Sequence, residues 1–186
     1  MTTIRTMTEK DVPAVSELRI RGWRWAYRGI VPQSYLDAMD PVQDAARRRE
    51  FFAASAGRVD NVLAVADAAV VGWASFGPCR GEPDAAVDGE LYALYLRPDW
   101  VGRGVGRALT DAVVERTARR GRRRLLLWVL ADNSRARRLY SAAGFAPDGA
   151  ETSDDYDGVR LREVRYVREL AATATTPATP ATGAIG

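Results

Sequence analysis

The sequence contains no histidine, one cysteine and one lysine among its 186 residues. The absence of histidine excludes Ser-His-Asp and Cys-His machinery and the ordinary zinc sites. Proton transfer must therefore rely on Asp, Glu, Tyr, water or the substrate itself. Cys79 has no partner for an internal disulfide, which favours a cytoplasmic location. Because no histidine can activate Cys79, we interpret it as an incidental thiol rather than a nucleophile.

Long hydrophobic runs are also missing. No stretch reaches the roughly 18 apolar residues that a membrane span needs. The N-terminus lacks the basic-then-apolar layout of a secretory signal. With 47% hydrophobic and 27% charged residues, the composition is that of a soluble globular protein, so we expect no membrane partner.

The net charge of +3 is carried almost wholly by arginine, since Lys10 is the one lysine. A charge of this size does not predict nucleic-acid binding. The cluster Arg119-Arg-Gly-Arg-Arg-Arg124 is a local exception with two interpretations. It fits the C-terminal end of a helix capped by Gly121, and it would also suit an anionic cofactor or a nucleic-acid contact.

Hydrophobic periodicity and turn residues predict a mixed α/β chain in which antiparallel strands precede one parallel crossover. Expected strands cover 4–7, 61–66, 69–76, 90–96, 125–130 and 159–170, with a short strand from Phe145. Expected helices start at Thr8 and cover 40–56, 104–120 and 132–143. Residues 21–29 are expected to end the first helix and begin an irregular wall, and loops are expected at 77–89 and 151–158. Residues 1–170 are expected to form one domain, and the Ala/Thr/Pro/Gly segment 171–186 a disordered tail.

The most informative segment runs from Glu90 through an apolar stretch into Val101-Gly-Arg-Gly-Val-Gly106. This predicts a strand, a glycine loop and a helix N-terminus, whose exposed backbone N–H groups suit a phosphate. The dinucleotide fingerprint G-x-G-x-x-G fails because Arg107 or Leu109 stands at its last position. The ATP loop fails because no Lys-Ser/Thr pair follows Gly106. A third interpretation is a loop for the pyrophosphate of an acyl-CoA, and the alternative is a structural loop that binds no ligand.

Two segments carry a family resemblance. Val101–Gly106 resembles the Gln/Arg-x-x-Gly-x-Gly/Ala signature of the GNAT superfamily of acyl-CoA N-acyltransferases, with Val101 in place of Gln or Arg. Asn133-Ser-Arg-Ala-Arg-Arg-Leu-Tyr140-Ser-Ala-Ala-Gly-Phe145 resembles the family's second signature, Asn-x-x-Ala-x-x-x-Tyr-x-x-x-Gly-Phe. The resemblance is clear over residues 90–170 and extends to the order of elements over residues 1–89.

The resemblance implies an α/β (α+β) fold with a mostly antiparallel sheet, a central parallel pair splayed around CoA, and helices on both faces. It implies acetyl-CoA as co-substrate and no metal. The cofactor contacts that it implies are Leu94, Tyr95, Leu96, Val101, Gly102, Arg103, Gly104, Val105, Gly106, Arg107, Asn133, Arg137 and Tyr140. Arg103 and Arg107 can equally be solvated, and Asn133 can equally be a helix N-cap.

The resemblance also assigns roles in catalysis. Tyr140 matches the family's proton donor to the leaving thiolate, and a phenol of pKa ~10 stays protonated at neutral pH. Its other interpretation is a core tyrosine. Glu90 is the predicted base, acting through a water, although it can also be a solvated strand-end residue. Tyr92 can replace Glu90 by orienting that water.

The acceptor pocket of the family is walled by the first two helices and the last hairpin. The expected wall residues are Trp23, Tyr27, Tyr35 and Tyr92, with Trp25 beside them. Arg24 and Arg28 are candidates for binding a carboxylate or phosphate, and Asp37 or Asp155 for binding an ammonium. Ordinary packing and solvated charge remain the alternative for each, so the substrate is not identified.

The predicted function is transfer of an acetyl group from acetyl-CoA to a primary amine, by direct attack in a ternary complex. The acceptor is a small-molecule or peptide amine, no nucleic acid is expected, and a homodimer is compatible with the sequence. Alternatives are a larger acyl donor, a self-resistance enzyme that acetylates an antibiotic, and a non-catalytic acyl-CoA sensor or interaction module.

Overall fold

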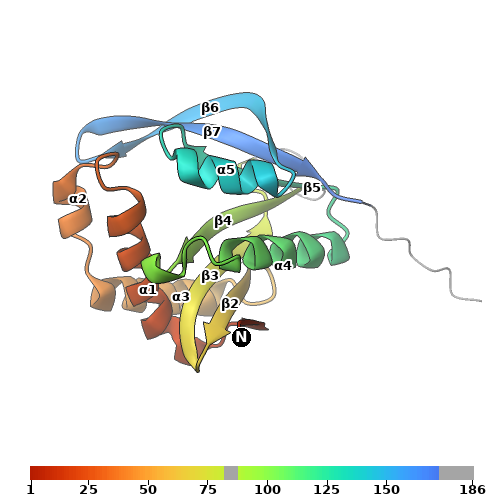
Figure 1. Cartoon of the computed structure of the whole chain (residues 1–186), viewed down its shortest axis with the longest axis horizontal. Helices are drawn as coiled ribbons and strands as arrows, with labels where there is room; N and C mark the ends of the chain where they lie inside the picture. Colours follow the sequence, from red (N-terminus) through yellow and green to blue (C-terminus); the bar gives the residue numbers. More distant parts are fainter. Residues whose placement is uncertain (82–87, 172–186) are drawn as a thin grey trace, which may run out of the picture.

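The computed structural model describes residues 1–81 and 88–171, so residues 82–87 of the predicted loop and 172–186 of the predicted tail lie outside the described residues. The described chain forms a seven-stranded sheet in the order β1-β2-β3-β4-β5-β7-β6 (Figure 1). Only β4 and β5 pair in parallel among these strands. The predicted mixed, mostly antiparallel sheet with one central parallel pair is therefore confirmed. The strands are β1 (Thr3–Thr6), β2 (Asp60–Ala66), β3 (Ala69–Pro78), β4 (Asp88–Leu96), β5 (Arg124–Leu130), β6 (Ala146–Tyr156) and β7 (Val159–Glu169).

Helices cover both faces of this sheet. They are the short helices η1 (Glu9–Asp11) and η2 (Pro98–Trp100) and the α-helices α1 (Val12–Ala26), α2 (Gln33–Asp37), α3 (Pro41–Ala54), α4 (Val105–Arg119) and α5 (Ser134–Ala142). Among them, within the described residues, no helix has the length and hydrophobicity of a bilayer span.

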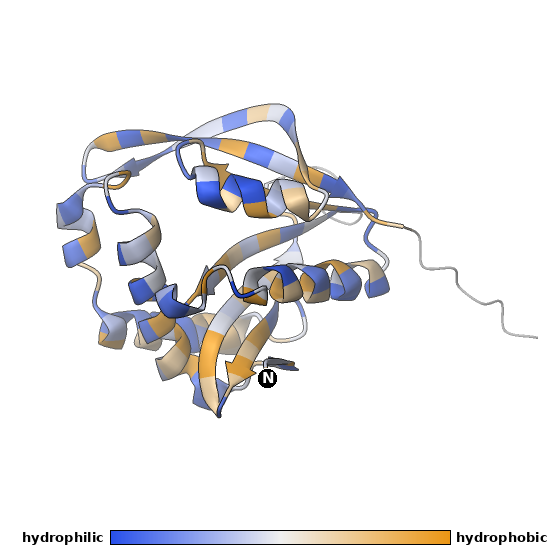
Figure 2. Cartoon of the chain, in the orientation of Figure 1, coloured by the Kyte–Doolittle hydropathy of each residue, from blue (hydrophilic) through white to orange (hydrophobic). Residues whose placement is uncertain are grey.

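Strand alternation sends neighbouring residues of β2 into two different cores. Leu63 packs in the cluster that contains Val12 of α1, whereas Val62 packs in the cluster that contains Leu109 of α4. Tyr140 of α5 joins the α4 cluster, so α4 and α5 lie on one face and α1 with α3 on the other. Figure 2 shows the hydrophobic residues of β2 and β3 between these layers, and the alternation of hydrophobic and hydrophilic residues along α4.

The parallel pair parts soon after it begins. In the described residues, β4 and β5 are paired only at Asp88↔Arg124, Gly89↔Leu125 and Glu90↔Leu126. A bulge follows at once, because Phe76 of β3 pairs with Leu91 and Ser75 pairs with Ala93, leaving Tyr92 as an extra residue. A bulge bends its strand, so β4 turns away from β5 at this point. At the end where the two strands are paired, Arg124 Nε of β5 donates a hydrogen bond of 2.9 Å to Oδ1 of the buried Asp88 in β4, which links the strands.

The first helix ends within 21–29, as predicted, but it continues to Ala26, because Gly22 packs against Tyr95 and Trp23 is buried in the aromatic cluster. Two other local predictions were wrong. Most of the predicted loop 151–158 belongs to β6, whose polar residues gain hydrogen-bonding partners from β7. That strand is also far longer than the short one expected from Phe145. The helix α2 was not predicted at all.

Candidate active site

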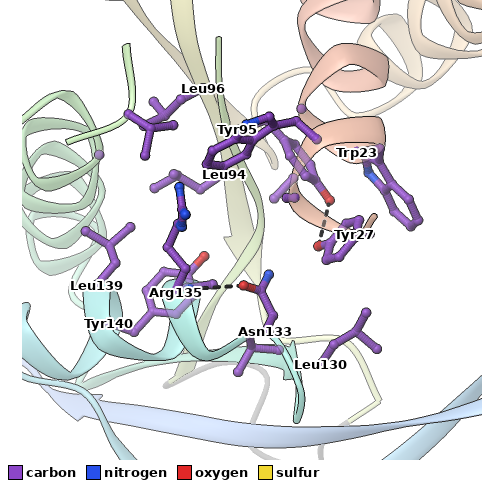
Figure 3. A pocket seen from close by; sticks show the side chains of 18 of the residues that line it. Trp23, Tyr27, Leu94, Tyr95, Leu96, Leu130, Asn133, Arg135, Leu139 and Tyr140 are labelled. Carbon is purple, nitrogen blue, oxygen red and sulfur yellow. Dashed lines mark hydrogen bonds between the residues drawn. The ribbon is translucent and has the colours of Figure 1, made fainter. Parts of the chain in front are cut away.

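A cavity of about 490 Å³ opens where β4 and β5 part. Its walls come from the end of α1, β4, the glycine loop, the start of α4, β5 and α5, with one residue each from β6 and β7. Figure 3 shows Trp23, Tyr27 and Tyr95 on one side, and Asn133, Leu139 and Tyr140 from the α5 region on the other. The cavity therefore joins the two segments that carry the family resemblance.

The glycine loop places main-chain donors at one end of this cavity. Gly102 and Gly104 both have φ of +81°, a left-handed conformation that favours glycine. Gly104 is the N-cap of α4 and has no side chain to cap the helix, so the first N–H groups of α4 remain available for an anion. A Cβ on Gly106 would lie 3.3 Å from Leu139 Cδ2, so glycine allows α5 to approach closely.

The predicted loop residues divide into two groups. Val101, Gly102, Gly104, Gly106 and Arg107 line the cavity, and Arg107 also pairs with Asp111 at 2.9 Å. Two others are absent from the described lining. The guanidinium of Arg103 stacks over Trp100 at 5.3 Å from the ring centroid, and Val105 is buried in the core.

The end of β4 lines the cavity at the predicted residues Leu94, Tyr95 and Leu96. Leu94 and Leu96 pack toward the α4 core, whereas Tyr95 packs toward Trp73 and α1. Its hydroxyl lies 3.5 Å from that of Tyr27, and burial raises the pKa of both phenols. The two faces of β4 thus contribute to different parts of the cavity.

Asn133 is the N-cap of α5, and it also lines the cavity. Its side-chain oxygen accepts a hydrogen bond from the Ala136 N–H at 3.1 Å, which caps α5, and the residue also lines the cavity (Figure 3). Arg137 is not among the described lining residues. It donates to the Tyr166 hydroxyl at 3.1 Å and to the Ala131 carbonyl at 2.9 Å, so it fastens α5 to β5 and β7.

Tyr140 is 8% exposed and lines the cavity next to Asn133 and Leu139. Its ring also packs edge-on against Phe145, with centroids 5.9 Å apart. Burial, with a smaller contribution from Tyr95, raises the pKa of its phenol, so the hydroxyl keeps its proton at neutral pH. The residue is both a core tyrosine and a protonated phenol that lines the cavity.

Glu90 is placed differently from the expectation. It is 2% exposed, and it is absent from the described cavity lining. Its carboxylate accepts hydrogen bonds from the Arg80 main-chain N–H at 2.9 Å and from Arg80 Nε at 3.1 Å. Tyr92 does line the cavity, but its hydroxyl donates to the Pro78 carbonyl, and burial raises its pKa to about 12. The geometry therefore favours neither Glu90 as the base nor Tyr92 as the residue that orients a water.

Glu163 is a carboxylate in the cavity that sequence reasoning missed. It lies on β7 opposite Leu130 of β5 and is half-buried. Burial raises the pKa of its carboxyl, Asp154 raises it further, and Arg80 partly opposes the change. Strand alternation places Glu163 on the face of Leu161, but the sequence does not show that this face lines the cavity.

The aromatic residues at the end of α1 form one cluster. Trp23 lies 4.7 Å from Tyr27 and 5.9 Å from Tyr35 between ring centroids, and Tyr35 packs on Tyr156 at 5.2 Å. Trp23, Tyr27 and Tyr156 line the cavity, whereas Tyr35 supports them from behind and is absent from the described lining. Trp25 also lines it, under the guanidinium of Arg135 at 4.3 Å.

The charged acceptor candidates have structural partners. Arg24 donates to the carbonyls of Leu36 and Met39, at 3.1 and 2.9 Å. Asp37 accepts from Gln33 at 2.8 Å, and Asp155 accepts from the Gly158 N–H at 3.0 Å. Within the described lining of the cavity, none of these three residues appears, and neither does Arg28.

The arginine cluster after α4 is also partnered. Arg119 pairs with Glu115, Arg120 with Asp60 and Arg124 with Asp88. Gly121 has φ of +76°, as its expected role at the end of the helix requires. The described residues contain no group of three or more His, Cys, Asp or Glu side chains that could hold a metal ion.

Comparison with known proteins places this architecture in a family. The family described as "Acetyltransferase (GNAT) family" matches residues 18–145, more than half of the chain. The uncharacterized N-acetyltransferase YuaI of Bacillus subtilis (strain 168) is 30% identical over 169 residues, 88% of this chain and 91% of that protein. The mycothiol acetyltransferase of Beutenbergia cavernae is 49% identical over 65 residues, which cover 35% of this chain and 22% of that protein.

Solved structures show the same fold. YncA from Salmonella typhimurium, a putative acetyltransferase solved with acetyl-CoA, gives a TM-score of 0.73 at 22% identity, covering 96% of this chain and 99% of that one. The PaiA N-acetyltransferase of Thermoplasma acidophilum, solved with coenzyme A, gives 0.71 at 20% identity, covering 91% and 99%. With the family match over residues 18–145 and the full-length similarity to YuaI, the chain belongs to the GNAT family of acetyltransferases.

Proposed function

We propose that this chain transfers an acetyl group from acetyl-CoA to the primary amine of a small molecule or peptide, by direct attack in a ternary complex. One observation carries the proposal. A single cavity joins a glycine loop with open main-chain donors to a buried phenol, a half-buried carboxylate and an aromatic wall. A donor and an acceptor can therefore meet inside one space.

The residues present fit acetyl-CoA, which supplies an activated thioester. The N–H groups at the start of α4 and the side chain of Arg107 suit a pyrophosphate, because they combine a helix N-terminus with a cation. Leu94, Tyr95 and Leu96 have no β5 partner in the described residues, so their main chain can pair with an extended arm. Asn133 lies where its amide can contact the same arm.

Proton transfer is assigned to two residues. The raised pKa of Tyr140 keeps its hydroxyl protonated, so it can donate to the departing thiolate. We assign the base role to Glu163 in preference to Glu90, because Glu163 lines the cavity and its pKa is raised toward neutrality. Glu90 instead holds Arg80. Trp23, Tyr27 and Tyr156 shape the space for the acceptor.

A thiol-release assay with acetyl-CoA tests the function against a panel of amino acids, aminophosphonates, polyamines, aminoglycosides and peptides. We expect turnover with at least one class, at a rate that depends on Tyr140. CoA binding without turnover of any amine would contradict the proposal and favour the acyl-CoA sensor. Thiol release with aminoglycosides and with no other class of amine would favour a resistance enzyme.

A further inference from the structure

A second cavity, of about 570 Å³, lies on the opposite side of β4 from the glycine loop, between α3 and the strands β3 and β4. Trp73 and Ala93 form part of its floor, and both belong to the core under α1 and α3. Its residues play no part in the contacts assigned to the cofactor. What this cavity binds is therefore a separate question.

Arginine dominates the lining of the second cavity. Five arginines and one carboxylate, that of Asp44, contribute to it among the described residues. Glu90 lies just outside and pairs with one of them, so the cations outnumber these two carboxylates by three. The five arginines are Arg19, Arg47, Arg48, Arg58 and Arg80.

Carboxylates and aromatic rings hold Arg19, Arg48 and Arg80 in place. Asp44 binds Arg19 at 2.8 Å and Arg48 at 3.1 Å at the same time, so neither cation has a carboxylate of its own. The Arg48 guanidinium also lies over Trp73, 4.4 Å from the ring centroid, and Arg80 lies over Tyr92 at the same distance. Stacked guanidinium groups keep their N–H edges in fixed positions, which suits a carboxylate or a phosphate.

The surroundings of Arg48 only partly balance the positive charge of its guanidinium. Its side chain is 14% exposed, and burial lowers its pKa. Asp44 opposes that change, whereas Arg19 adds to it by repulsion. Because arginine stays protonated in proteins, Arg48 keeps its positive charge and shares the one Asp44 carboxylate with Arg19. Arg47, on the exposed side, forms no ion pair with any residue that the structure describes.

The two cavities share a wall. Tyr92 and Ala93 of β4 line both, and Arg19 lies over Trp23, which lines the first. An acceptor that spans this shared wall would place its amine in the first cavity and a second group in the other. Acceptors of this shape would carry an amine at one end and an anionic group at the other.

We propose that the second cavity binds the anionic group of the acceptor, so that the substrates are primary amines bearing a carboxylate, phosphonate or phosphate. This inference rests on the proposed acetyl transfer. It predicts discrimination against polyamines and aminoglycosides, since five arginines would repel further cations. The attraction comes from Arg47 and from the Nη1 groups of Arg48 and Arg80, because the Nε and Nη2 groups of these two arginines already bind Asp44 and Glu90.

The test compares matched pairs of acceptors in the thiol-release assay: free amino acids against their α-amides, and aminophosphonates against the corresponding neutral amines. We expect the anionic member to have a kcat/KM at least about tenfold higher, because a charge-assisted hydrogen bond is lost in the other. A higher value for carboxylates than for phosphonates, or the reverse, identifies which anion the cavity accepts.

Three variants assign the effect to the cavity. Arg48→Gln and Arg47→Gln should each raise KM for the anionic acceptor severalfold, and leave the Kd for CoA and the kcat/KM of neutral amines unchanged. Arg47 is exposed, so its variant remains informative if Arg48→Gln fails to fold. Arg49→Gln is the matched control on the same helix, outside this cavity's described lining and paired with Glu9 at 3.4 Å.

The outcomes separate the two proposals. Equal rates for acids and amides, or equal losses in Arg48→Gln and Arg49→Gln, would overturn the anionic subsite while acetyl transfer stands. Absence of turnover with every amine would overturn the transfer itself, and the assignment of this cavity to an acceptor with it.

Discussion

The two ends of the first cavity, which contains the glycine loop, are lined by different parts of the chain. At the glycine-loop end, the donors are main-chain N–H groups, fixed by the left-handed Gly102 and Gly104 and by the start of α4. At the α1 end, the contacts are side chains from four separate elements, including Trp23, Tyr156 and Glu163. A main-chain site needs only one local conformation, whereas a side-chain site needs several elements to meet in the right register.

This difference would allow the acceptor end to change while the donor end stays the same. Backbone donors contact an anion without using side chains, so substitutions that preserve glycine leave them intact. Each wall residue at the other end can change without disturbing the loop. The following variants test whether donor binding and acceptor chemistry separate in this way.

Tyr140→Phe should have the largest effect. We expect kcat to fall about 100-fold, because general acid catalysis typically contributes at least that factor. Phenylalanine keeps the ring packing on Phe145, so the melting temperature and the Kd for CoA should stay near those of the native protein. Tyr166→Phe, which removes a buried hydroxyl outside the cavity, is the control. Unchanged kcat in Tyr140→Phe would show a purely structural tyrosine.

Gly104→Val should weaken CoA binding about tenfold or more, since a branched residue at φ of +81° costs about 1–3 kcal/mol and moves the loop. Titration calorimetry with CoA measures the change. Gly57→Val provides the matched control, because Gly57 has φ of +77° in an equally open position after α3. It should lose stability but keep CoA affinity. Equal losses of affinity in both variants would contradict the role of the loop.

Glu163→Gln should lower kcat/KM about tenfold at neutral pH and change its pH dependence. The folded carboxyl has a raised pKa and acts as a base when deprotonated, so activity should be lost as pH falls through that raised value. Gln cannot titrate, so this acid limb should disappear from the profile. Glu90→Gln should instead lower stability by about 1–3 kcal/mol, because a buried acceptor of Arg80 is weakened. The reverse pattern would restore Glu90 as the base.

The smallest effects are expected for Asn133→Ala and Asp40→Ala. Each removes an N-cap, with Asp40 accepting from the Val42 N–H at 2.7 Å, and each should cost about 1 kcal/mol of unfolding free energy. Only Asn133 lines the cavity, so only its variant should also raise the Kd for CoA. Denaturant unfolding and calorimetry give both values. Equal CoA affinity in the two variants would reduce Asn133 to a cap.

Much of the fold and of the cofactor end followed from local patterns. The apolar strand before the glycines, the helix start after them and the capping role of Asn133 depend on neighbours within a few residues. The details that local patterns did not predict depend on tertiary contacts. The first helix continues as far as Ala26 because Gly22 and Trp23 pack on distant aromatic rings, and the polar strand β6 exists because β7 supplies its hydrogen bonds.

By itself the sequence determined the chemistry that was available: no histidine, a glycine loop for an anion, and a phenol on a helix with an asparagine cap. The tertiary structure decided which carboxylate faces the cavity. Glu90 and Glu163 are both strand residues, but the bulge at Tyr92 and the pairing with Arg80 remove the first from the lining, while the register of β7 on β5 brings the second into it. Strand registers and long-range ion pairs depend on residues far apart in the chain, so a local pattern does not show them.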